Sequence, residues 1–291
     1  MKHLFCFGLG YTGQALAVVL KDQGWKISGT TRDEATKKRL ERDGYQMFLL
    51  DGDHQMPVDV LDDVSHVLLS IPPGDKGDPV FLRYGTALAE RASKLEWVGY
   101  LSTTGVYGDR QGGWVDENSP LTPSTARGEK RLKAETDWLE LYKSHDLPVH
   151  LFRLAGIYGP GSNQLEKVAA GKANRRIKPG QIFSRIHVDD IVGILMASMF
   201  KPNPGQAYNV CDDEAVPPQD VVTFAAQLLN VEPPQEIAFN PKDMTAMGLS
   251  FFAESKRVSN ERVKAELGYV FKYPTYREGL KALLHTLSNR A

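Results

Sequence analysis

The sequence predicts an α/β fold in which helices cover both faces of a parallel sheet. Three observations lead to this prediction. Through the first half of the chain, short apolar runs alternate with longer amphipathic runs, as expected for strands that are buried on both faces. A glycine-rich turn over residues 8–13 joins the first apolar run to the first amphipathic run. The 291 residues suffice for one large domain, or for a domain with a smaller lobe.

Six strands are expected in the first part of the chain, at residues 3–8, 25–29, 46–50, 66–71, 97–102 and 149–154. The helices expected between them cover residues 12–22, 34–42, 79–94 and 127–144. In the last helix, Leu132, Leu139 and Tyr142 lie on roughly one stripe, with charged residues elsewhere. This alternation favours a Rossmann-type, doubly wound parallel sheet.

After Leu154, glycines and prolines break the chain into short pieces, which predicts a smaller C-terminal α+β lobe. We expect a first domain over residues 1–158 and a substrate lobe over residues 159–291. Residues 186–211 are expected to return to the sheet of the first domain, as a strand at 186–188, a helix at 189–200 and a strand at 207–210. Two further helices are expected near 219–229 and 275–288.

Composition and charge narrow the classes of partner. The 35 basic and 36 acidic residues nearly cancel, so we expect a small-molecule ligand, and neither nucleic acid nor a membrane surface, as the main partner. Cys6 and Cys211 lie in apparent strands and are interpreted as buried thiols of a reduced compartment, and we expect no metal site from them. The glycine turn interrupts what would otherwise imitate a secretion signal, so we expect a cytoplasmic protein.

The glycine turn has the spacing of a dinucleotide site. Gly8, Gly10 and Gly13 form a Gly-x-Gly-x-x-Gly pattern directly after an apolar strand and directly before a helix. Glycines permit the tight turn and close backbone approach, and the N–H groups at the helix N-terminus can then bind a pyrophosphate. We therefore predict that residues 1–158 bind a dinucleotide, with Tyr11 and Thr12 part of the same turn.

The end of the second strand should determine the choice of cofactor. An Asp or Glu there would bind the ribose 2′-hydroxyl of NAD, but the strand ends in Thr31-Arg32, with no acid before Asp33. This favours a 2′-phosphate, so NADP is preferred over NAD; alternatively, Arg32 is a solvated residue at a helix start. Asp51 is a candidate for the adenine amino group or else a turn aspartate. Ser70, at the end of the fourth strand, is also included among the cofactor contacts.

Further motifs follow the glycine turn in a characteristic order. They are residues 101–108 (LSTTGVYG), Asp116-Glu117 with Ser119-Pro120, Arg153, residues 156–161 (GIYGPG), residues 185–190 (RIHVDD) and residues 208–210 (YNV). In this series the chain resembles an atypical extended short-chain dehydrogenase/reductase of the NAD-dependent epimerase/dehydratase type. The resemblance covers most of the chain.

The resemblance implies roles for several residues. In such enzymes a hydroxyl of the first of these motifs binds the reacting oxygen, which points to Thr103, or less securely to Ser102. Residues 156–161 and 185–190 align with segments that help bind a nucleotide-sugar, which implies substrate contacts by Tyr158, Asn163 and Arg185. His187 is interpreted as packed, while Asp189 and Asp190 also suit a helix N-cap.

The catalytic Tyr-x-x-x-Lys of such enzymes is missing, because none of the tyrosines is followed four residues later by a lysine. The alignment places Arg127 at the tyrosine and Arg131 at the lysine. Arginine stays protonated, so it cannot serve as acid or base. These two residues could instead bind a phosphate or carboxylate of the substrate together, or Arg131 could pair with Glu135 on the helix surface.

Two functions remain open from the sequence. The first is an oxidoreductase or epimerase/dehydratase with a non-standard active site, in which Tyr107 or Tyr158 moves the proton. The alternative is a non-catalytic NAD(P)H-binding sensor or carrier. A homodimer is one option for the assembly, since helices of this fold commonly pair.

Overall fold

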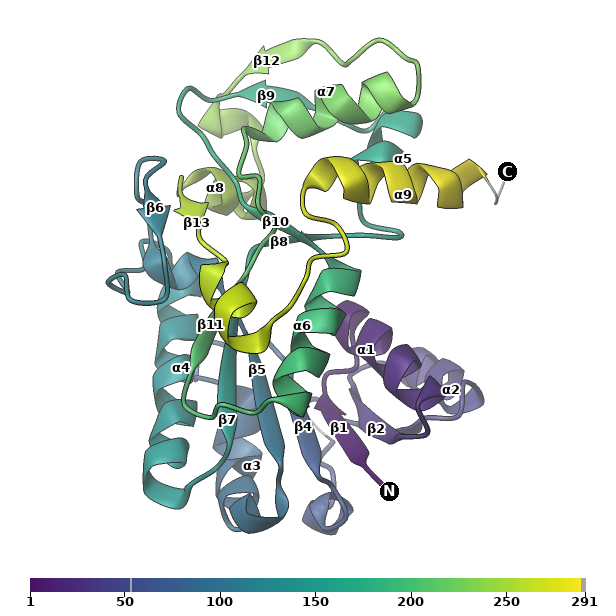
Figure 1. Cartoon of the computed structure of the whole chain (residues 1–291), viewed down its shortest axis with the longest axis vertical. Coiled ribbons are helices and arrows are strands. Elements are labelled where there is room, and N and C mark those ends of the chain that lie inside the picture. The colour runs from purple at the N-terminus through teal and green to yellow at the C-terminus, as the bar shows by residue number, and fades with distance from the viewer. Residues whose placement is uncertain (53, 289–291) are drawn as a thin grey trace. The chain divides into compact units, whose positions relative to one another are not determined.

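A computed structural model describes residues 1–52 and 54–288 of the chain (Figure 1). The chain divides into two compact units. The first unit contains Met1–Ser102, Glu129–Arg153 and Leu195–Tyr208. The second unit contains Thr103–Gly128, Leu154–Ile194 and the chain from Asn209 onward. Each unit is built around its own core.

A seven-stranded parallel sheet forms the centre of the fold, in the order β11-β7-β5-β4-β1-β2-β3. Its strands are β1 (His3–Phe7), β2 (Lys26–Thr31), β3 (Gln46–Leu49), β4 (His66–Leu69), β5 (Trp97–Thr103), β7 (Val149–Leu154) and β11 (Ala207–Val210). The predicted α/β, doubly wound sheet is confirmed, and each of these strands lies within two residues of its expected bounds.

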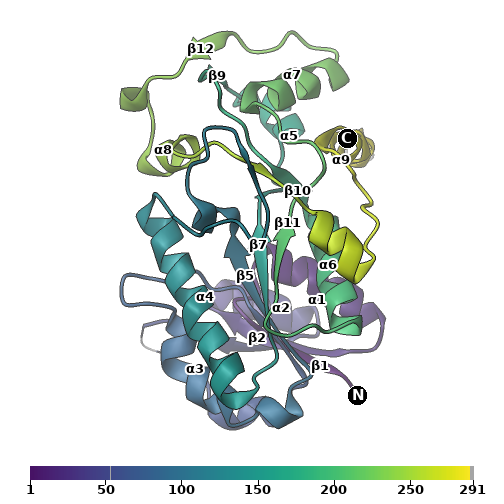
Figure 2. The same cartoon turned by 60° about the vertical axis from the view of Figure 1, so that its left-hand side comes forward.

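Helices cover both faces of this sheet (Figure 2). They are α1 (Tyr11–Asp22), α2 (Glu34–Arg42), α3 (Pro79–Ala89), α4 (Ala126–His145) and α6 (Val188–Phe200). On one face, strand residues such as Phe7 and Leu69 pack against Tyr84 of α3 and Trp138 of α4. On the other face, Trp97 donates from Nε1 to Ser198 of α6 at 3.0 Å. Apolar residues are therefore needed at successive positions of each strand.

The predicted helix over residues 79–94 is shorter than expected. Asp78 caps its start by accepting from the N–H of Val80 at 2.8 Å, and Pro79 occupies the first turn. The helix ends at Ala89, and a 3₁₀ turn covers Ala92–Lys94. Arg91 donates to the carbonyl of Ala87 at 2.9 Å, so the helix end is closed by a side chain from the following residues.

The second unit combines short strand pairs with helices. The pairs are β8 (Gly156–Tyr158) with β10 (Arg185–His187), β9 (Arg175–Ile177) with β12 (Glu236–Ala238), and β6 (Trp114–Val115) with β13 (Arg257–Val258). Its helices α5 (Gln164–Ala169), α7 (Pro218–Leu228) and α9 (Tyr276–Ser288) pack around one apolar core, and α8 (Ala246–Phe252) is a further helix. The expected return of residues 186–188 to the central sheet is wrong, because β10 pairs with β8 in a separate sheet. The edge of the central sheet is taken by β11.

Candidate functional site

The glycine turn is fixed tightly against its own unit. Gly8 has φ of +84°, and its N–H donates to Thr30 Oγ1 at 2.8 Å. A Cβ on Gly8 would lie 2.8 Å from Ile71 Cγ1, and one on Gly13 would lie 2.9 Å from Cys6 Sγ. Larger residues at these two positions would therefore force the turn and α1 away from β1.

Gly10 marks an open position in the same turn. It precedes α1 in an extended conformation and gives the helix no side-chain cap. A Cβ there would have only the carbonyl oxygen of Gly8 nearby, at 3.9 Å. Tyr11 is 42% exposed, whereas Thr12 is buried. The uncapped N–H groups and the positive end of the helix dipole fit an anionic group such as a pyrophosphate.

At the end of β2, Arg32 is exposed. The neighbouring acid, Asp33, accepts from the N–H of Thr36 at 2.6 Å and caps α2. Hydrogen bonds from Thr36 lower the pKa of Asp33. Thr31 Oγ1 accepts from the N–H of Asp33 at 3.3 Å. The acid that follows this strand thus caps the helix. A contact of Arg32 with the cofactor ribose stays a prediction.

Asp51 and Ser70 lie at two different places in the first unit. Asp51 accepts from the N–H and the Nδ1 of His54, at 2.8 and 3.0 Å, as the alternative of a turn aspartate requires. Its contact with adenine stays a prediction. The N–H of Ser70 donates to the carbonyl of Phe7 at 3.0 Å, directly beside the glycine turn.

The register of the sheet brings one edge of three strands together. Phe7 pairs with Leu69, and Leu69 pairs with Tyr100. The residues that follow these positions therefore lie side by side at the carboxyl ends of β1, β4 and β5. Ligands of doubly wound folds bind at this edge. Gly8 and Ser70 lie there, and their contact with a cofactor stays a prediction.

Beyond Tyr100, β5 ends in a buried polar network. Ser102 donates to Glu135 Oε1 at 2.5 Å, and Arg153 donates from Nη2 to Glu135 Oε2 at 2.8 Å. Glu135 is 1% exposed. The hydroxyl proton of Ser102 is therefore engaged by a buried carboxylate, which favours Thr103 over Ser102 as the group that binds a reacting oxygen.

Arg131, which the motif alignment places at the family lysine, is buried in the first unit. It is 8% exposed and donates from Nη1 to the carbonyl of Leu101 at 2.6 Å and to the hydroxyl of Tyr100 at 3.2 Å. Burial raises the pKa of Tyr100. Among the described residues Glu135 pairs with Arg153 and not with Arg131, so the predicted surface pair is wrong. Arg127 is exposed, whereas Arg131 is buried. The structure therefore gives no support to a joint contact of these two arginines with the substrate.

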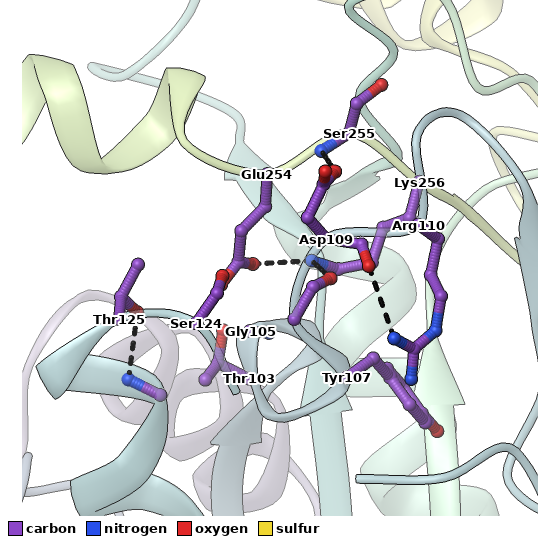
Figure 3. A network of polar contacts seen from close by, with 12 residues as sticks. Thr103, Gly105, Tyr107, Asp109, Arg110, Ser124, Thr125, Glu254, Ser255 and Lys256 are labelled. Carbon is purple, nitrogen blue, oxygen red and sulfur yellow. Dashed lines mark hydrogen bonds and ion pairs between the residues drawn. The ribbon is translucent and has the colours of Figure 1, made fainter. Parts of the chain in front are cut away.

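In the second unit, Thr103 keeps a half-buried side chain (Figure 3). Its Oγ1 accepts from the N–H of Gly105 at 3.2 Å, which leaves its own hydroxyl hydrogen for another acceptor. Tyr107 is fully buried and donates to Asn209 Oδ1 at 2.7 Å. The prediction that Tyr107 moves a proton is corrected accordingly, because its hydroxyl has no surface through which a substrate could reach it.

The predicted substrate contacts of the second unit differ in their surroundings. Asn163 is buried and caps α5, accepting from the N–H of Glu166 at 2.9 Å, so its amide serves its own loop. Tyr158 and Arg185 lie on paired strands, on the same face of the sheet. The Tyr158 hydroxyl is buried without a hydrogen-bond partner among the described residues. Arg185 donates to the carbonyl of Phe183 at 3.1 Å.

The residues at the end of β10 and the start of α6 contact neighbouring parts of the second unit. His187 is buried against the ring of Tyr158, as expected, with centroids 5.1 Å apart. Asp190 accepts from the hydroxyl of Tyr269 at 2.8 Å and from the N–H of Lys272 at 2.7 Å, so it holds a later loop. Asp189 pairs with Lys272.

Within residues 1–52 and 54–288, no group of three His, Cys, Asp or Glu side chains could hold a metal ion. None of the helices in this part of the chain combines the length and the hydropathy of a membrane span.

The sequence did not indicate two charged groups that the structure shows. One is the buried network of Glu135 and Arg153 in the first unit. The other is Glu254 with Lys256, which contact the loop after β5 in the second unit. Arg153 was noted only as part of a motif, and residues 254–256 belong to no motif, so sequence spacing carried no signal for either pairing.

Comparisons with known proteins identify the family. A family model described as "NAD dependent epimerase/dehydratase family" matches residues 82–211. The chain is also 30% identical to protein YeeZ of Escherichia coli K12 over 289 residues, which cover 94% of this chain and 97% of that protein. The chain belongs to the NAD dependent epimerase/dehydratase family. The resemblance predicted from the motifs is thereby confirmed.

Two solved structures place this family member among its relatives. A functionally unknown conserved protein from Silicibacter pomeroyi is 48% identical, with a TM-score of 0.90 and 99% of both chains covered. UDP-glucuronic acid 4-epimerase from Bacillus cereus, solved with UDP-glucuronic acid and NAD, has a TM-score of 0.78 at 18% identity, with 100% of both chains covered. At that identity the epimerase shows the shared fold alone.

Proposed function

We propose that this family member is an enzyme that binds NADP in preference to NAD and oxidises or reduces a carbon bearing a hydroxyl in a nucleotide-sugar or related polyol. The observation that carries the proposal is the turn before α1, where Gly10 leaves the N-terminus of the helix uncapped and open. Gly8, Gly13 and Ser70 hold the backbone around it. These residues fit the pyrophosphate of a dinucleotide.

The cofactor would supply hydride acceptance and donation at its nicotinamide ring. The chain itself supplies binding and orientation. Arg32 is the exposed cation at the end of β2, suited to a 2′-phosphate. Thr103 carries a hydroxyl whose oxygen already accepts from Gly105, and its hydrogen can be donated to a substrate oxygen.

The second unit supports a polar substrate. Tyr158 has a buried hydroxyl with no partner among the described residues, and a buried polar atom of this kind is usually satisfied by a ligand or water. Arg185 follows on the paired strand. The structurally similar epimerase binds UDP-glucuronic acid, so a nucleotide-sugar is the first substrate class to examine.

Turnover on a defined panel tests the proposal. The purified chain is incubated with NADP or NAD and with UDP-glucose, UDP-glucuronic acid or dTDP-glucose, and products are analysed by mass spectrometry. Thr103→Val should lower the turnover number by about 10²-fold, since it removes one donor to the reacting oxygen. Thr223→Val is the control, because Thr223 donates to a carbonyl of its own helix. Cofactor binding with no turnover on any substrate contradicts the enzyme and favours a sensor or carrier.

Arg32→Ala tests the cofactor preference separately. Loss of a charged hydrogen bond to the 2′-phosphate should weaken NADP binding by about tenfold or more, with NAD binding changed by less than about twofold. Arg42→Ala, which removes an exposed arginine at the other end of α2, is the control. Dissociation constants from isothermal titration calorimetry measure both effects. Equal losses for NADP and NAD would contradict the role of Arg32.

A further inference from the structure

A short segment of the second unit, residues 254–256, is anchored through its middle residue. The N–H of Ser255 donates to Asp109 Oδ1 at 2.8 Å, and its hydroxyl donates to the carbonyl of Gly180 at 2.8 Å. The carbonyl of Ser255 accepts from the N–H groups of Arg110 and Gly112, at 3.0 and 2.9 Å. These four hydrogen bonds fix the segment, and the side chains on either side of Ser255 are held in place.

Glu254 and Lys256 form a buried ion pair beside the loop after β5 (Figure 3). Lys256 Nζ donates to Glu254 Oε2 at 2.5 Å and to the carbonyl of Gly108 at 2.8 Å. Ser124 donates to Glu254 Oε1 at 2.9 Å. The side chains of Lys256 and Glu254 are 9% and 11% exposed, and burial lowers the pKa of Lys256. Removing both charges from water is costly, so the pair is a candidate for more than a structural role.

Gly105 leaves a gap between this carboxylate and the hydroxyl of Thr103. A Cβ on Gly105 would lie 3.5 Å from Thr103 Oγ1 and 3.9 Å from Glu254 Oε2. Both oxygens thus lie within 4 Å of one position that carries no side chain. In the close-up, Gly105 lies between Thr103 and Glu254 (Figure 3). A hydroxyl donor and a carboxylate acceptor on either side of an open position are the groups that a substrate alcohol requires.

We propose that Glu254 is the general acid–base of this enzyme, that it exchanges a proton with the substrate hydroxyl bound by Thr103, and that Lys256 is the residue that positions its carboxylate. The proposal rests on the proposed function above. On oxidation, the O–H bond breaks and its proton goes to Glu254 Oε2. The electron pair left on the oxygen forms the carbonyl as the hydride of the same carbon leaves to the oxidised nicotinamide dinucleotide. Reduction returns the proton from Glu254 to the oxygen.

Glu254 places a carboxyl group where the family tyrosine is missing. A carboxyl group can exchange a proton with a substrate hydroxyl, which the guanidinium of the arginine at position 127 cannot do. Lys256 holds this carboxylate by donating from Nζ to Oε2.

Gly105→Ala tests the gap without disturbing the fold. Gly105 is not among the glycines with positive φ, and the added methyl would meet its neighbours at 3.4 Å or more, which is ordinary contact. The methyl would fill the position between Thr103 and Glu254. Turnover on the best substrate of the panel should fall by about 10²-fold or more, with NADPH binding and thermal unfolding unchanged. Gly85→Ala, where the nearest neighbours lie at 3.5 Å or more, is the control.

Substitutions of the pair separate proton transfer from structure. Glu254→Gln should lower the turnover number by about 10²–10⁴-fold, whereas Glu236→Gln, at an exposed ion pair with Arg175, should not. Lys256→Met should lower the turnover number and leave NADPH binding unchanged, because the carboxylate of Glu254 loses the donor that holds it. Lys256→Arg, which keeps a donor, should restore most of the turnover. A purely structural pair would change thermal unfolding and leave the turnover number unchanged.

The outcomes distinguish this assignment from the proposed function. Wild-type protein that turns over no substrate of the panel overturns both. Wild-type turnover that Gly105→Ala and Glu254→Gln retain within about threefold overturns the assignment alone. If Glu254→Gln does not fold, Gly105→Ala decides, since its added methyl fits without a clash.

Discussion

Glu135→Ala is expected to lower the free energy of unfolding by about 3–5 kcal/mol, because it removes the buried carboxylate that pairs with the guanidinium of Arg153. Arg153 donates to both carboxylate oxygens of Glu135, and the two side chains are 5% and 2% exposed. The same variant deprives Ser102 of its acceptor. Chemical denaturation followed by circular dichroism measures the change.

A matched control removes an ion pair from the exposed side of the same helix. Asp137 pairs with Lys133 at 2.9 Å, and Asp137→Ala is expected to cost less than about 1 kcal/mol. Glu135→Leu combined with Arg153→Met removes both buried charges and should recover most of the stability that Glu135→Ala loses. A double variant as unstable as Glu135→Ala would show that packing dominates at this site.

Acidification is expected to destabilise the protein through buried neutral histidines, and His150 offers the clearest case. It is fully buried in β7, and its Nε2 accepts from the N–H of Asn203 at 3.0 Å. Burial lowers the pKa of His150 from 6.5 to about 4. Between these values the unfolded chain binds a proton that the folded chain does not. Above the pKa that His150 has in the unfolded chain, its contribution to the free energy of unfolding is fully present. That contribution, up to about 3 kcal/mol, is lost as the pH falls through the pKa that His150 has in the folded chain.

His150→Gln isolates this contribution. Its amide oxygen can accept from the N–H of Asn203, and the side chain takes up no proton in this range. Burial raises the pKa values of Asp78 and Asp190. These two carboxyl groups therefore favour folding as the pH falls, opposite to the histidines, and they do so in wild type and variant alike. The difference in unfolding free energy between the two proteins should therefore shrink as the pH falls. A difference that stays constant from neutral to acidic pH would contradict the role of His150.

Local sequence patterns predicted the elements well, because strands and helices follow from nearby residues. The apolar runs, the helix cap at Asp78 and the glycine turn each depend on neighbours within a few positions. The same patterns failed for residues 186–188. Their composition suits a strand, but which sheet the strand joins is decided by β8, a short element that follows β7.

The candidate site shows the same division. Sequence alone pointed to Thr103, and less securely to Ser102, as the hydroxyl that binds the reacting oxygen. The structure favours Thr103, because Ser102 donates to Glu135, which lies 33 residues away in the chain. The roles of Arg131 and Tyr107 likewise depended on burial, which each residue acquires from distant strands and helices.

By itself, the sequence determined that this protein carries a glycine-rich turn before the first helix of a parallel α/β sheet and that none of its tyrosines is followed four residues later by a lysine. These features depend on residue type and short spacing. Only the tertiary structure decided which charges meet, since Lys256 reaches the carbonyl of Gly108 across 148 positions of sequence. No periodic pattern encodes such a contact, because it arises when two loops are held side by side by the packing of the unit that contains them.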